Sequence, residues 1–423
     1  MARQMKDSGV EWIGQIPEDW EIVRIKQLFA EVDERCTKGN EYTLLSVSEY
    51  YGVSPKKDHL NEDDMLTHAE TLDGYKICRK NDIVMNIMLA WKRALGVSEY
   101  IGIISPAYCV YRARQEVCAK YFHYLFRTDI YAELFKQNST GIIDSRLRLY
   151  PDKFLALKCQ VPPLEQQDKI ASYLDRKCAE IDAIIAKQQQ IIEKLKEYKL
   201  SVITEAVTKG LDPNVPMKDS GVEWIGKIPE HWNILKLQAH TRMLTPMRDR
   251  PEKLDGDIPW VRIEDYDGKY ISTSKEGLGV SLETVNEMNL KIYPVGSILC
   301  TSSCDLGKCA IVTRELVSNQ RFINIIPDLD TNSDYLYYLM LSNAKRLNHL
   351  STGTIQANLS RKAFEHLMVQ FPPFAEQKEI AEYLDKKCET VELSIRKKQE
   401  LIDRLNLYKK SLIYETVTGK KEI

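Results

Sequence analysis

The chain contains 423 residues and carries a formal net charge of −2, with 43% hydrophobic and 28% charged residues. This composition is typical of a soluble globular protein of two to four domains. No run of about 18 apolar residues is present, so we expect no membrane span. The N-terminus lacks the apolar stretch of a signal peptide, and ten cysteines follow no framework spacing, so we expect a cytoplasmic protein with free thiols.

Two long repeats organise the chain. The ten residues MKDSGVEWIG occur at 5–14 and again at 217–226, and the sequence at 161–210 resembles that at 371–420. Ten consecutive identities do not arise by chance, so we infer that the chain is duplicated. A duplicated chain presents two similar surfaces, which suits a partner that itself has two halves.

Residues 1–160 are expected to form a first mixed α/β domain. After the repeated opening segment, short apolar runs predict strands, and one amphipathic pattern predicts a helix. Basic and acidic residues are nearly balanced here and in the second divergent segment, so neither segment is a basic module. The predicted strands cover residues 42–47, 82–88, 107–112 and 154–161, and the predicted helix covers residues 118–137.

Residues 161–210 and 372–423 predict two long spacer helices. Apolar side chains recur in each at helical steps, without Pro or Gly for over forty residues. A stripe along helices of roughly 60 Å is buried most simply against the other helix, so we expect an antiparallel coiled coil. Separate helical bundles are the alternative. The stripe consists of Leu174, Cys178, Ile181, Ile185, Ile192, Leu195 and Val202, each matched by an apolar residue 210 positions later.

Residues 211–371 are expected to form a second mixed α/β domain. The predicted fold class is therefore α+β, with two mixed α/β domains joined by two long helices in a pseudo-two-fold internal repeat. A shared scaffold with different loops implies the same task performed on two different targets. The predicted strands cover residues 296–301, 322–326 and 366–371, and the predicted helix covers residues 333–349.

No pattern in the chain assembles a catalytic centre. The Pro-Pro pairs at 162–163 and 372–373 resemble part of an adenine methyltransferase motif, but Val161 and Phe371 stand where Asn or Asp would hold the amine. A strand followed by the start of a helix explains these prolines better. The chain has no Walker loop and no GxGxxG sequence.

Cysteines and histidines give no metal-binding signature. Cys300, Cys304 and Cys309 lie close in sequence, but they form no CxxC pair, have no neighbouring His and have no counterpart in the first half. We therefore expect ordinary thiols. The seven His residues show no HExxH-like spacing. The sequence predicts a binding protein that holds no metal and performs no chemistry of its own.

Two tryptophans recur in the repeated opening segment. Trp12 and Trp20 are matched by Trp224 and Trp232. An identical feature cannot discriminate between two targets. We therefore expect these side chains to pack in the core or to dock a partner that is common to both halves.

The strongest candidate contact loop is 139–147 (STGIIDSRL), with 351–359 (STGTIQANL) as its counterpart. Both begin with Ser-Thr-Gly and end in Leu, while the residues between them differ. Arg, Asn and Gln side chains read guanine and adenine edges through paired hydrogen bonds, so a fixed frame with variable residues suits base recognition. An exposed loop with drifting polar residues is the alternative. The candidate base-contacting residues are Ser145, Arg146, Gln356 and Asn358.

Other basic and aromatic side chains are weaker candidates for contact with phosphate. Each of them alone is explained as well by an ordinary surface position. These candidates are Lys56, Lys57, Trp91, Lys92, Arg93, Arg148, Arg248, Arg262, Lys308 and Arg361.

Taken together, these features resemble the specificity subunit of type I restriction-modification enzymes over essentially the whole chain. The resemblance rests on the repeated KDSGVEWIG…IPE.W opening, the two divergent domains, and the sequences PPLEQ (162–166) and PPFAEQ (372–377) that begin the long helices. The additional Ala375 in the second copy is a small departure.

The resemblance implies that each divergent domain is a target recognition domain for one half of a split, asymmetric sequence in double-stranded DNA. The helices would set the spacing and dock two methyltransferase subunits that carry S-adenosylmethionine. Restriction subunits using ATP and Mg could join them, while this chain would bind no cofactor or membrane and would not be an enzyme. The alternatives are an autonomous DNA methyltransferase, which would itself bind S-adenosylmethionine, and a scaffold for proteins alone, whose complex would show no DNA sequence preference.

Overall fold

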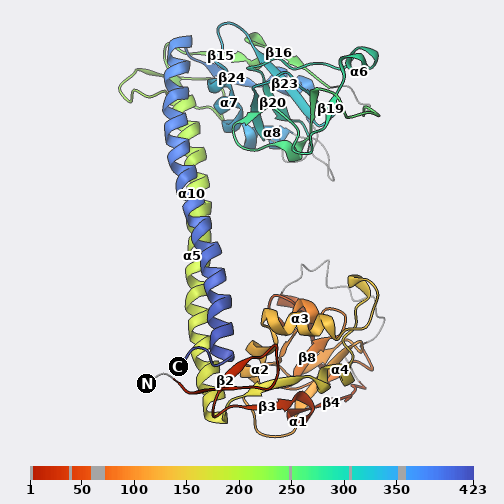
Figure 1. Ribbon diagram of the computed structural model, residues 1–423. Helices are drawn as coiled ribbons and strands as arrows, with labels where there is room; N and C mark the ends of the chain where they lie inside the picture. Colours follow the sequence, from red (N-terminus) through yellow and green to blue (C-terminus); the bar gives the residue numbers. More distant parts are fainter. Residues whose placement is uncertain (1–2, 38–40, 59–71, 247–249, 304–306, 351–358) are drawn as a thin grey trace. The chain divides into compact units, whose positions relative to one another are not determined.

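The computed structural model describes residues 3–37, 41–58, 72–246, 250–303, 307–350 and 359–423 (Figure 1). It divides into two compact units, one of residues 1–188 with 400–423 and the other of residues 189–399. Each unit therefore contains one α/β domain and parts of both long helices. Among the described residues, no helix is long and apolar enough to cross a membrane.

In the first unit, the repeated opening segment and the end of the domain lie together. The opening segment forms a hairpin of β1 (Met5–Asp7) and β2 (Gln15–Pro17). The next strand, β3 (Glu21–Arg24), pairs antiparallel with β12 (Lys158–Val161), the last strand before the long helix. This pairing holds both ends of the domain at the base of the helix.

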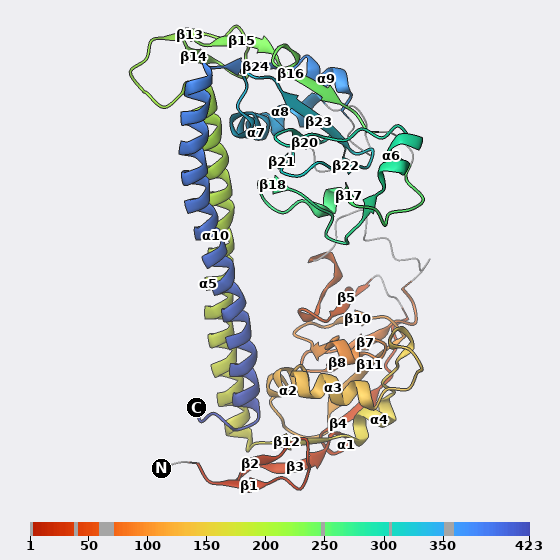
Figure 2. The same ribbon diagram turned by 45° about the horizontal axis from the view of Figure 1, so that its top comes forward.

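The central sheet of the first domain is antiparallel, in the order β4 (Phe29–Val32), β11 (Tyr108–Ala113), β8 (Ile83–Asn86), β9 (Leu95–Val97). Side chains alternate across β8 as the period of a strand requires. Ile83 and Met85 pack with the helices α2 (Ala119–Phe126) and α3 (Asp129–Gln137), whereas Val84 faces a second sheet. Figure 2 shows these helices beside the sheet.

The second sheet of this domain has the order β6 (Gly52–Pro55), β5 (Thr43–Ser48), β10 (Gly102–Ile104), β7 (Lys76–Cys78). Its β5 and β10 are parallel. Two short helices, α1 (Ile25–Leu28) and α4 (Pro151–Ala156), pack near the opening strands. The strands predicted at 42–47, 82–88 and 107–112 are present with ends shifted by one or two residues.

Two predicted elements of the first domain are corrected. The helix predicted at 118–137 is two helices, because Thr128 is extended and its hydroxyl donates to the Leu125 carbonyl at 2.8 Å. The strand predicted at 154–161 begins as α4, where Pro151 occupies the first helical turn with a preset φ. Only its last part is the strand β12.

The second unit repeats this architecture. Its opening hairpin is β13 (Met217–Asp219) with β14 (Lys227–Pro229), and β15 (Asn233–Lys236) pairs with β24 (Met368–Phe371). The main sheet has the order β16 (Thr241–Leu244), β23 (Phe322–Pro327), β20 (Ile298–Thr301), β21 (Cys309–Val312), β18 (Tyr270–Ile271). The first four strands follow the order of β4, β11, β8 and β9.

A smaller sheet, β19 (Gly279–Val280), β17 (Ile258–Val261), β22 (Val317–Ser318), contains a parallel pair like that of β5 and β10. The helices are α6 (Leu282–Glu287), α7 (Ser333–Ser342), α8 (Ala344–Leu350) and α9 (Arg361–Glu365). The helix predicted at 333–349 is thus divided at Asn343, whose side-chain amide donates to the Leu339 carbonyl at 2.9 Å. The strand predicted at 366–371 begins two residues later.

The two long helices, α5 (Leu164–Lys209) and α10 (Phe374–Val417), are present and antiparallel, as predicted (Figure 1). In the first unit, Lys409 pairs with Asp182 at 2.6 Å; in the second, Lys199 pairs with Glu392 at 2.5 Å. The residue numbers of each pair have the same sum, so the antiparallel register is constant. Each residue of the second pair lies 210 positions from its counterpart in the first, so one ion pair occurs twice.

The predicted apolar stripe forms the seam between these helices, because each of its members is buried or half-buried in both copies. Each helix ends in a glycine at φ +75°, and the tryptophan of the opening segment covers it. Gly419 lies against Trp20, and Gly210 lies against Trp232. Trp20 and Trp232 are fully buried, so core packing explains them.

One glutamine joins each domain to its helix. The side-chain amide of Gln167 donates to the Pro162 carbonyl at 2.9 Å, and its oxygen accepts from the Cys118 N–H at 3.0 Å. Gln377 donates to the Pro372 carbonyl at 2.9 Å and accepts from the Asn332 N–H at 2.9 Å. The Pro-Pro segments are therefore strand-to-helix junctions, as predicted.

Candidate nucleic-acid interface

The predicted contact loop of the first domain is closed at its base and exposed at its tip. Thr140 and Arg148 exchange two backbone hydrogen bonds of 2.9 Å each. A side chain at Gly141 would collide with the backbone of Arg146, so the tight path of the loop requires glycine. Ile142 at the tip is 100% exposed. The loop therefore projects from the domain on a narrow, defined base.

A tryptophan and a lysine join this loop to the body of the domain. Trp91 lies in η4 (Ala90–Lys92), and the Nζ of Lys136, at the end of α3, lies 4.9 Å from the centre of its ring. The same Lys136 pairs with Asp144 in the loop at 2.9 Å. The structure therefore gathers two segments that the sequence had suggested separately, the Trp91 segment and the 139–147 loop, on one surface.

The individual candidates on this surface are accessible. Lys92 is exposed and its ammonium lies 5.2 Å from the Trp91 ring centre. Ser145 and Arg146 lie in η5 (Asp144–Arg146) and are exposed. Within the part of the chain that the structure describes, the Arg146 guanidinium has no hydrogen bond or ion pair. Arg146 is thus available for a ligand.

Other candidates of the first domain are placed differently. Arg93 forms an ion pair with Asp129, and Arg148 donates to the Leu147 carbonyl at 2.9 Å. Both guanidinium groups therefore already serve the fold. Lys56 and Lys57 lie in η2 (Lys56–Asp58) directly after β6, where Lys57 is exposed.

Two exposed tyrosines in the first domain were not among the candidates from the sequence. Tyr50 and Tyr51 form the turn between β5 and β6, and both are exposed. The Arg127 guanidinium holds that turn by donating to the carbonyl of Tyr50 at 2.9 Å and to those of Arg93 and Leu95 at 2.7 Å. Burial lowers the pKa of Arg127 to about 10, so it remains charged at neutral pH. Adjacent aromatic residues before a turn glycine are the available sequence signal.

In the second domain, the equivalent loop lies mostly outside the described residues, and so do Arg248, Gln356 and Asn358. The end of the loop is described. The Leu359 N–H donates at 2.8 Å to the carbonyl of Ser302, which follows β20. In the first domain the Leu149 N–H donates at 2.9 Å to the carbonyl of Ile87, which follows β8. The two leucines therefore occupy the same place.

This equivalence corrects the alignment of the two loops. The sequence comparison paired Leu147 with Leu359, but Leu149 is the structural counterpart, because Leu149 and Leu359 each precede the N-cap residue of the following helix, α4 or α9, and bond the matching strand end. The first loop is accordingly two residues longer. Counted back from these leucines, Arg148 rather than Arg146 corresponds in sequence to Asn358, so the candidate residues of the two loops are not matched one to one.

The remaining candidates of the second domain lie around the same strand end. A cavity of 470 Å³ is lined by Ser302, Gln320, Leu359 and Arg361, among others. Arg361 also pairs with Glu365 at 2.6 Å. Lys308 is exposed at the start of β21, whose Cys309 is the register partner of Cys300 in β20.

Arg262 is less accessible. It pairs with Glu276 at 2.7 Å, and the hydrogen bond with Glu276 raises the pKa of Arg262. This contact holds its charged end against the domain.

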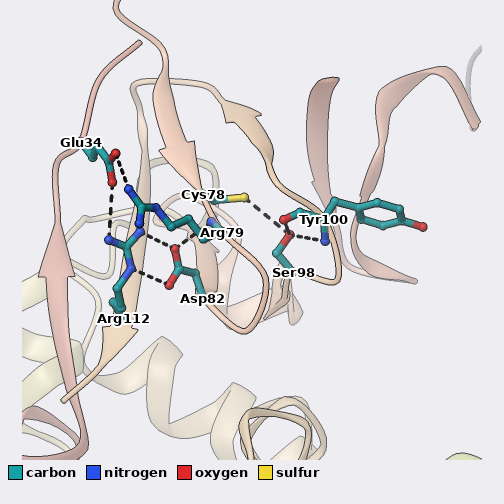
Figure 3. Close-up of polar contacts among 7 residues, drawn as sticks. All are labelled: Glu34, Cys78, Arg79, Asp82, Ser98, Tyr100 and Arg112. Carbon is teal, nitrogen blue, oxygen red and sulfur yellow. Dashed lines mark hydrogen bonds and ion pairs between the residues drawn. The ribbon is translucent and has the colours of Figure 1, made fainter. Parts of the chain in front are cut away.

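A charged network behind the first sheet has a structural role. Arg112 on β11 makes two hydrogen bonds with the buried Asp82, of 3.0 and 2.8 Å, and a third with Glu34 (Figure 3). Arg79 donates to Glu34 at 2.8 Å, and this hydrogen bond lowers the pKa of Glu34. The network ties the turn before β8 to β11. All four charges are paired.

The described residues contain no group of three or more His, Cys, Asp or Glu side chains that could hold a metal ion. Cys300 and Cys309 lie side by side on neighbouring strands with 2.9 Å between their sulfurs, and both are buried. Burial raises the pKa of the Cys300 thiol, which makes it a poor nucleophile. Cys304 lies outside the described residues.

Comparison with known proteins shows similarity to one family. The family described as type I restriction modification DNA specificity domain matches residues 240–402. The chain is 32% identical over 189 residues to the type I restriction enzyme MjaIX specificity subunit of Methanocaldococcus jannaschii, covering 43% of this chain and 44% of that protein. It is 25% identical over 432 residues to the MjaVIII specificity subunit of the same organism, covering 96% and 94%.

The fold as a whole also has a solved counterpart. A chain from a structure of the assembly and conformational transition of the type I R-M system matches with a TM-score of 0.72 at 14% identity. The match covers 96% of this chain and 99% of the other. Both domains and both long helices are therefore shared with that fold.

Proposed function

This chain belongs to the specificity subunits of type I restriction-modification enzymes, and we propose that its two domains read the two halves of a divided DNA target. The observation that carries the proposal is the combination of one scaffold with two unlike sets of loops. Four strands of the main sheet match in order, β4, β11, β8 and β9 with β16, β23, β20 and β21. From the shared Ser-Thr-Gly to the matched leucine, however, the first loop is two residues longer than the second. Different loops on equal frames select different bases, so the target is asymmetric.

The paired helices are proposed as the spacer between the half-sites. A helix of 46 residues is about 69 Å long at 1.5 Å per residue. This length corresponds to about two turns of B-DNA at ~34–36 Å per turn. The constant register of the two helices supports a fixed separation. Joining two modest contacts in one chain also raises the effective concentration of the second half-site.

Two matched grooves are proposed as docking sites for methyltransferase subunits. In the first unit, α10 residues 407–414 line a groove of 580 Å³ with the start of α3. In the second, the matching α5 residues 197–204 line one of 850 Å³ with the end of α7. Beside the grooves, Tyr408 is 54% exposed and its counterpart Tyr198 is 53% exposed. Two similar surfaces at matching places suit two copies of one partner.

In the proposed assembly, the cofactors are bound by the partner subunits. We propose that S-adenosylmethionine is bound by the methyltransferase subunits and that ATP and Mg are bound by restriction subunits. The chain has a near-neutral net charge of −2, so phosphate neutralisation would come largely from those partners. The specificity subunit itself is not an enzyme and contributes recognition alone.

The test is a methylation map. The chain is co-expressed with its methyltransferase subunit, and modified adenines are located by sequencing of the host DNA. The expected motif has two unlike parts separated by unspecified bases, and it is absent when this chain is omitted. A contiguous motif, or an unchanged motif without the chain, would refute divided recognition.

A second experiment addresses the docking grooves. Tyr198→Glu and Tyr408→Glu place a charge beside one groove each. We expect each single variant to lose one methyltransferase copy in native mass spectrometry and the double variant to lose both. Leu329→Glu, at a residue that is 97% exposed and distant in sequence from both grooves, serves as the control. Full occupancy of the double variant would exclude these grooves.

A further inference from the structure

Each recognition domain is fastened to its following helix at one matched aspartate. Asp175 of α5 and Asp385 of α10 are 210 positions apart, and each accepts a hydrogen bond from a tyrosine hydroxyl. Tyr124 of α2 donates to Asp175 at 2.8 Å, and Tyr338 of α7 donates to Asp385 at 2.6 Å. The neighbouring Leu174 and its counterpart are fully buried, so these contacts lie at the edge of the domain–helix core.

A lysine completes each junction, but the two lysines come from different elements. In the first unit, Lys120 of α2 lies between Asp175, at 2.9 Å, and Glu99, at 3.0 Å. In the second unit, Lys269 precedes β18 and lies between Asp385, at 2.5 Å, and Asp334, at 2.6 Å. Both junctions therefore consist of one ammonium between two carboxylates, with a tyrosine on the helix aspartate.

The charged residues around the helix aspartate are arranged differently in the two halves. The offset that relates Tyr124 to Tyr338 also relates Lys120 to Asp334. Glu99 follows β9, and Lys269 precedes β18, the strand that pairs with the counterpart of β9. The position of Lys120 on α2 therefore carries a carboxylate in the second half, and an ammonium from a neighbouring element meets the helix aspartate instead. The contact between an ammonium and the helix aspartate is thus present in both halves, although the lysine comes from different elements.

We propose that Asp175 and Asp385, with the lysine and tyrosine that meet each of them, are positioning residues that fix the orientation of each recognition domain on the helix pair. This inference rests on the proposed divided recognition of DNA. One base pair changes the direction of a half-site by roughly 34°, since B-DNA has about 10.5 base pairs per turn. A domain held at one angle accepts one spacer length, and a domain that swings accepts neighbouring lengths.

The two junctions differ in strength. The Lys269 side chain is 15% exposed, whereas the Lys120 side chain is 44% exposed. Ion pairs of exposed side chains contribute little, and a partly buried ammonium depends more on its partners. The second junction therefore restrains its domain more firmly, and its loss has the larger effect.

The experiment uses the complete methyltransferase complex and a DNA library in which the wild-type half-sites are separated by the native spacer or by one base pair more or fewer. We expect Asp385→Ala to raise methylation at the altered spacers, relative to the native one, by about tenfold, and Asp175→Ala by about threefold, because the second contact is the less exposed of the two. The sequences of both half-sites stay unchanged. Tyr338→Phe and Tyr124→Phe, which remove one hydroxyl each, give smaller changes in the same direction and guard against misfolding of the alanine variants.

A charge reversal supplies the sharpest control. Lys120→Asp alone places a second carboxylate beside Asp175 and should allow methylation at spacers one base pair longer or shorter. Adding Glu99→Lys installs the arrangement of the second junction in the first and should restore strict spacing, which a purely local loss of stability would not predict.

The outcomes separate the two proposals. A wild-type complex without a split target contradicts the proposed function itself. A split target whose spacer stays strict in all aspartate and tyrosine variants overturns only the positioning role. Reduced discrimination between bases within a half-site, at the native spacer length, would also overturn the positioning role. The residues would then affect the contacts with bases rather than the orientation of the domain.

Discussion

At the scale of single residues, the loop after α3 contains two arginines whose side chains differ in their contacts. Arg146 is exposed and carries no partner among the described residues, while the neighbouring Arg148 is held by the Leu147 carbonyl. Two arginines two positions apart in sequence therefore differ in whether their guanidinium groups are available for a ligand. The sequence ranks Arg146 above Arg148 because Arg146 lies in the candidate loop, but sequence alone does not reveal whether a guanidinium is already engaged.

We expect Arg146→Ala to relax recognition at one base pair of one half-site. Loss of a paired hydrogen bond to a base edge costs about 1–3 kcal/mol, which corresponds to roughly five- to 150-fold weaker discrimination. The measurement is a methylation competition between the native target and targets with single substitutions. Lys153→Ala, an exposed cation on α4, is the control and should change nothing. Unaltered discrimination in Arg146→Ala would remove this loop from the interface.

His123 makes the first domain sensitive to acid. Burial, followed by the nearby Arg127 charge, lowers the pKa of His123 to about 3, and its Nδ1 accepts from the Val97 N–H at 3.3 Å. The unfolded chain binds a proton near pH 6.5, whereas the folded domain does not until about pH 3. The folded state is therefore favoured fully above pH 6.5, and this contribution is lost progressively as the pH falls through that window.

We expect acidification from pH 7 to pH 5 to reduce the stability of the first domain by about 1–2 kcal/mol through this residue. His123→Gln, which can still accept from Val97, should lessen the decrease. Hydrogen exchange of the α2 amides, corrected for the intrinsic rate at each pH, measures it, and His366→Gln on an exposed site is the control. An equal decrease in the His123→Gln variant would assign the acid sensitivity elsewhere.

At the scale of elements, periodicity predicted the long helices and their pairing because apolar residues in a single stripe have no other surface to cover. The same reasoning wrongly predicted α2 and α3 as one helix, and α7 and α8 as one helix. Thr128 and Asn343 end the first helix of each pair through bonds from their side chains to carbonyls three or four residues earlier. Apolar spacing continues through both breaks, so periodicity cannot detect them. The equivalence of Leu149 and Leu359 could not be predicted either, because it is defined by hydrogen bonds to the ends of β8 and β20 and is therefore visible only in the fold.

The helix pair permits a direct test of the spacer. Seven residues inserted after Ala186 of α5, together with seven inserted before Leu405 of α10, lengthen both helices by two turns at facing positions. Both ion pairs, Asp182–Lys409 and Lys199–Glu392, keep their registers. The added ~10 Å corresponds to about three base pairs, which also turn the half-site by roughly 100°. We therefore expect the extended complex to lose activity on the native spacer. When Asp175→Ala and Asp385→Ala are added to release the domains, we expect methylation at a spacer about three base pairs longer, with both half-sites unchanged.

The same insertion in α5 alone provides the contrast, because it must break the register of one ion pair or the other. We expect that variant to lose methylation. A doubly extended complex that keeps the native spacer would show that the helices do not set the separation.

At the scale of the whole chain, the internal repeat makes each half complementary to a second copy of itself. Lys199 and Asp182 in the first half correspond to Lys409 and Glu392 in the second. In a dimer of second halves, Lys409 of one copy would meet Glu392 of the other. The glycine that ends α10 would lie against Trp232, as Gly210 does in the complete chain.

We therefore expect residues 211–423, produced alone, to form a homodimer rather than an unfolded or monomeric fragment. With methyltransferase subunits it should modify a palindromic target made of two inverted copies of the second half-site at about the native spacing, since a two-fold protein reads a two-fold sequence. Light scattering gives the mass of the fragment, and the methylation map gives its target. Glu392→Lys reverses one partner of each inter-copy ion pair, placing two lysines together twice in the dimer but only once in the complete chain. It should weaken the dimer far more than it weakens the complete subunit; equal effects would show that the ion pairs do not hold the two copies in register.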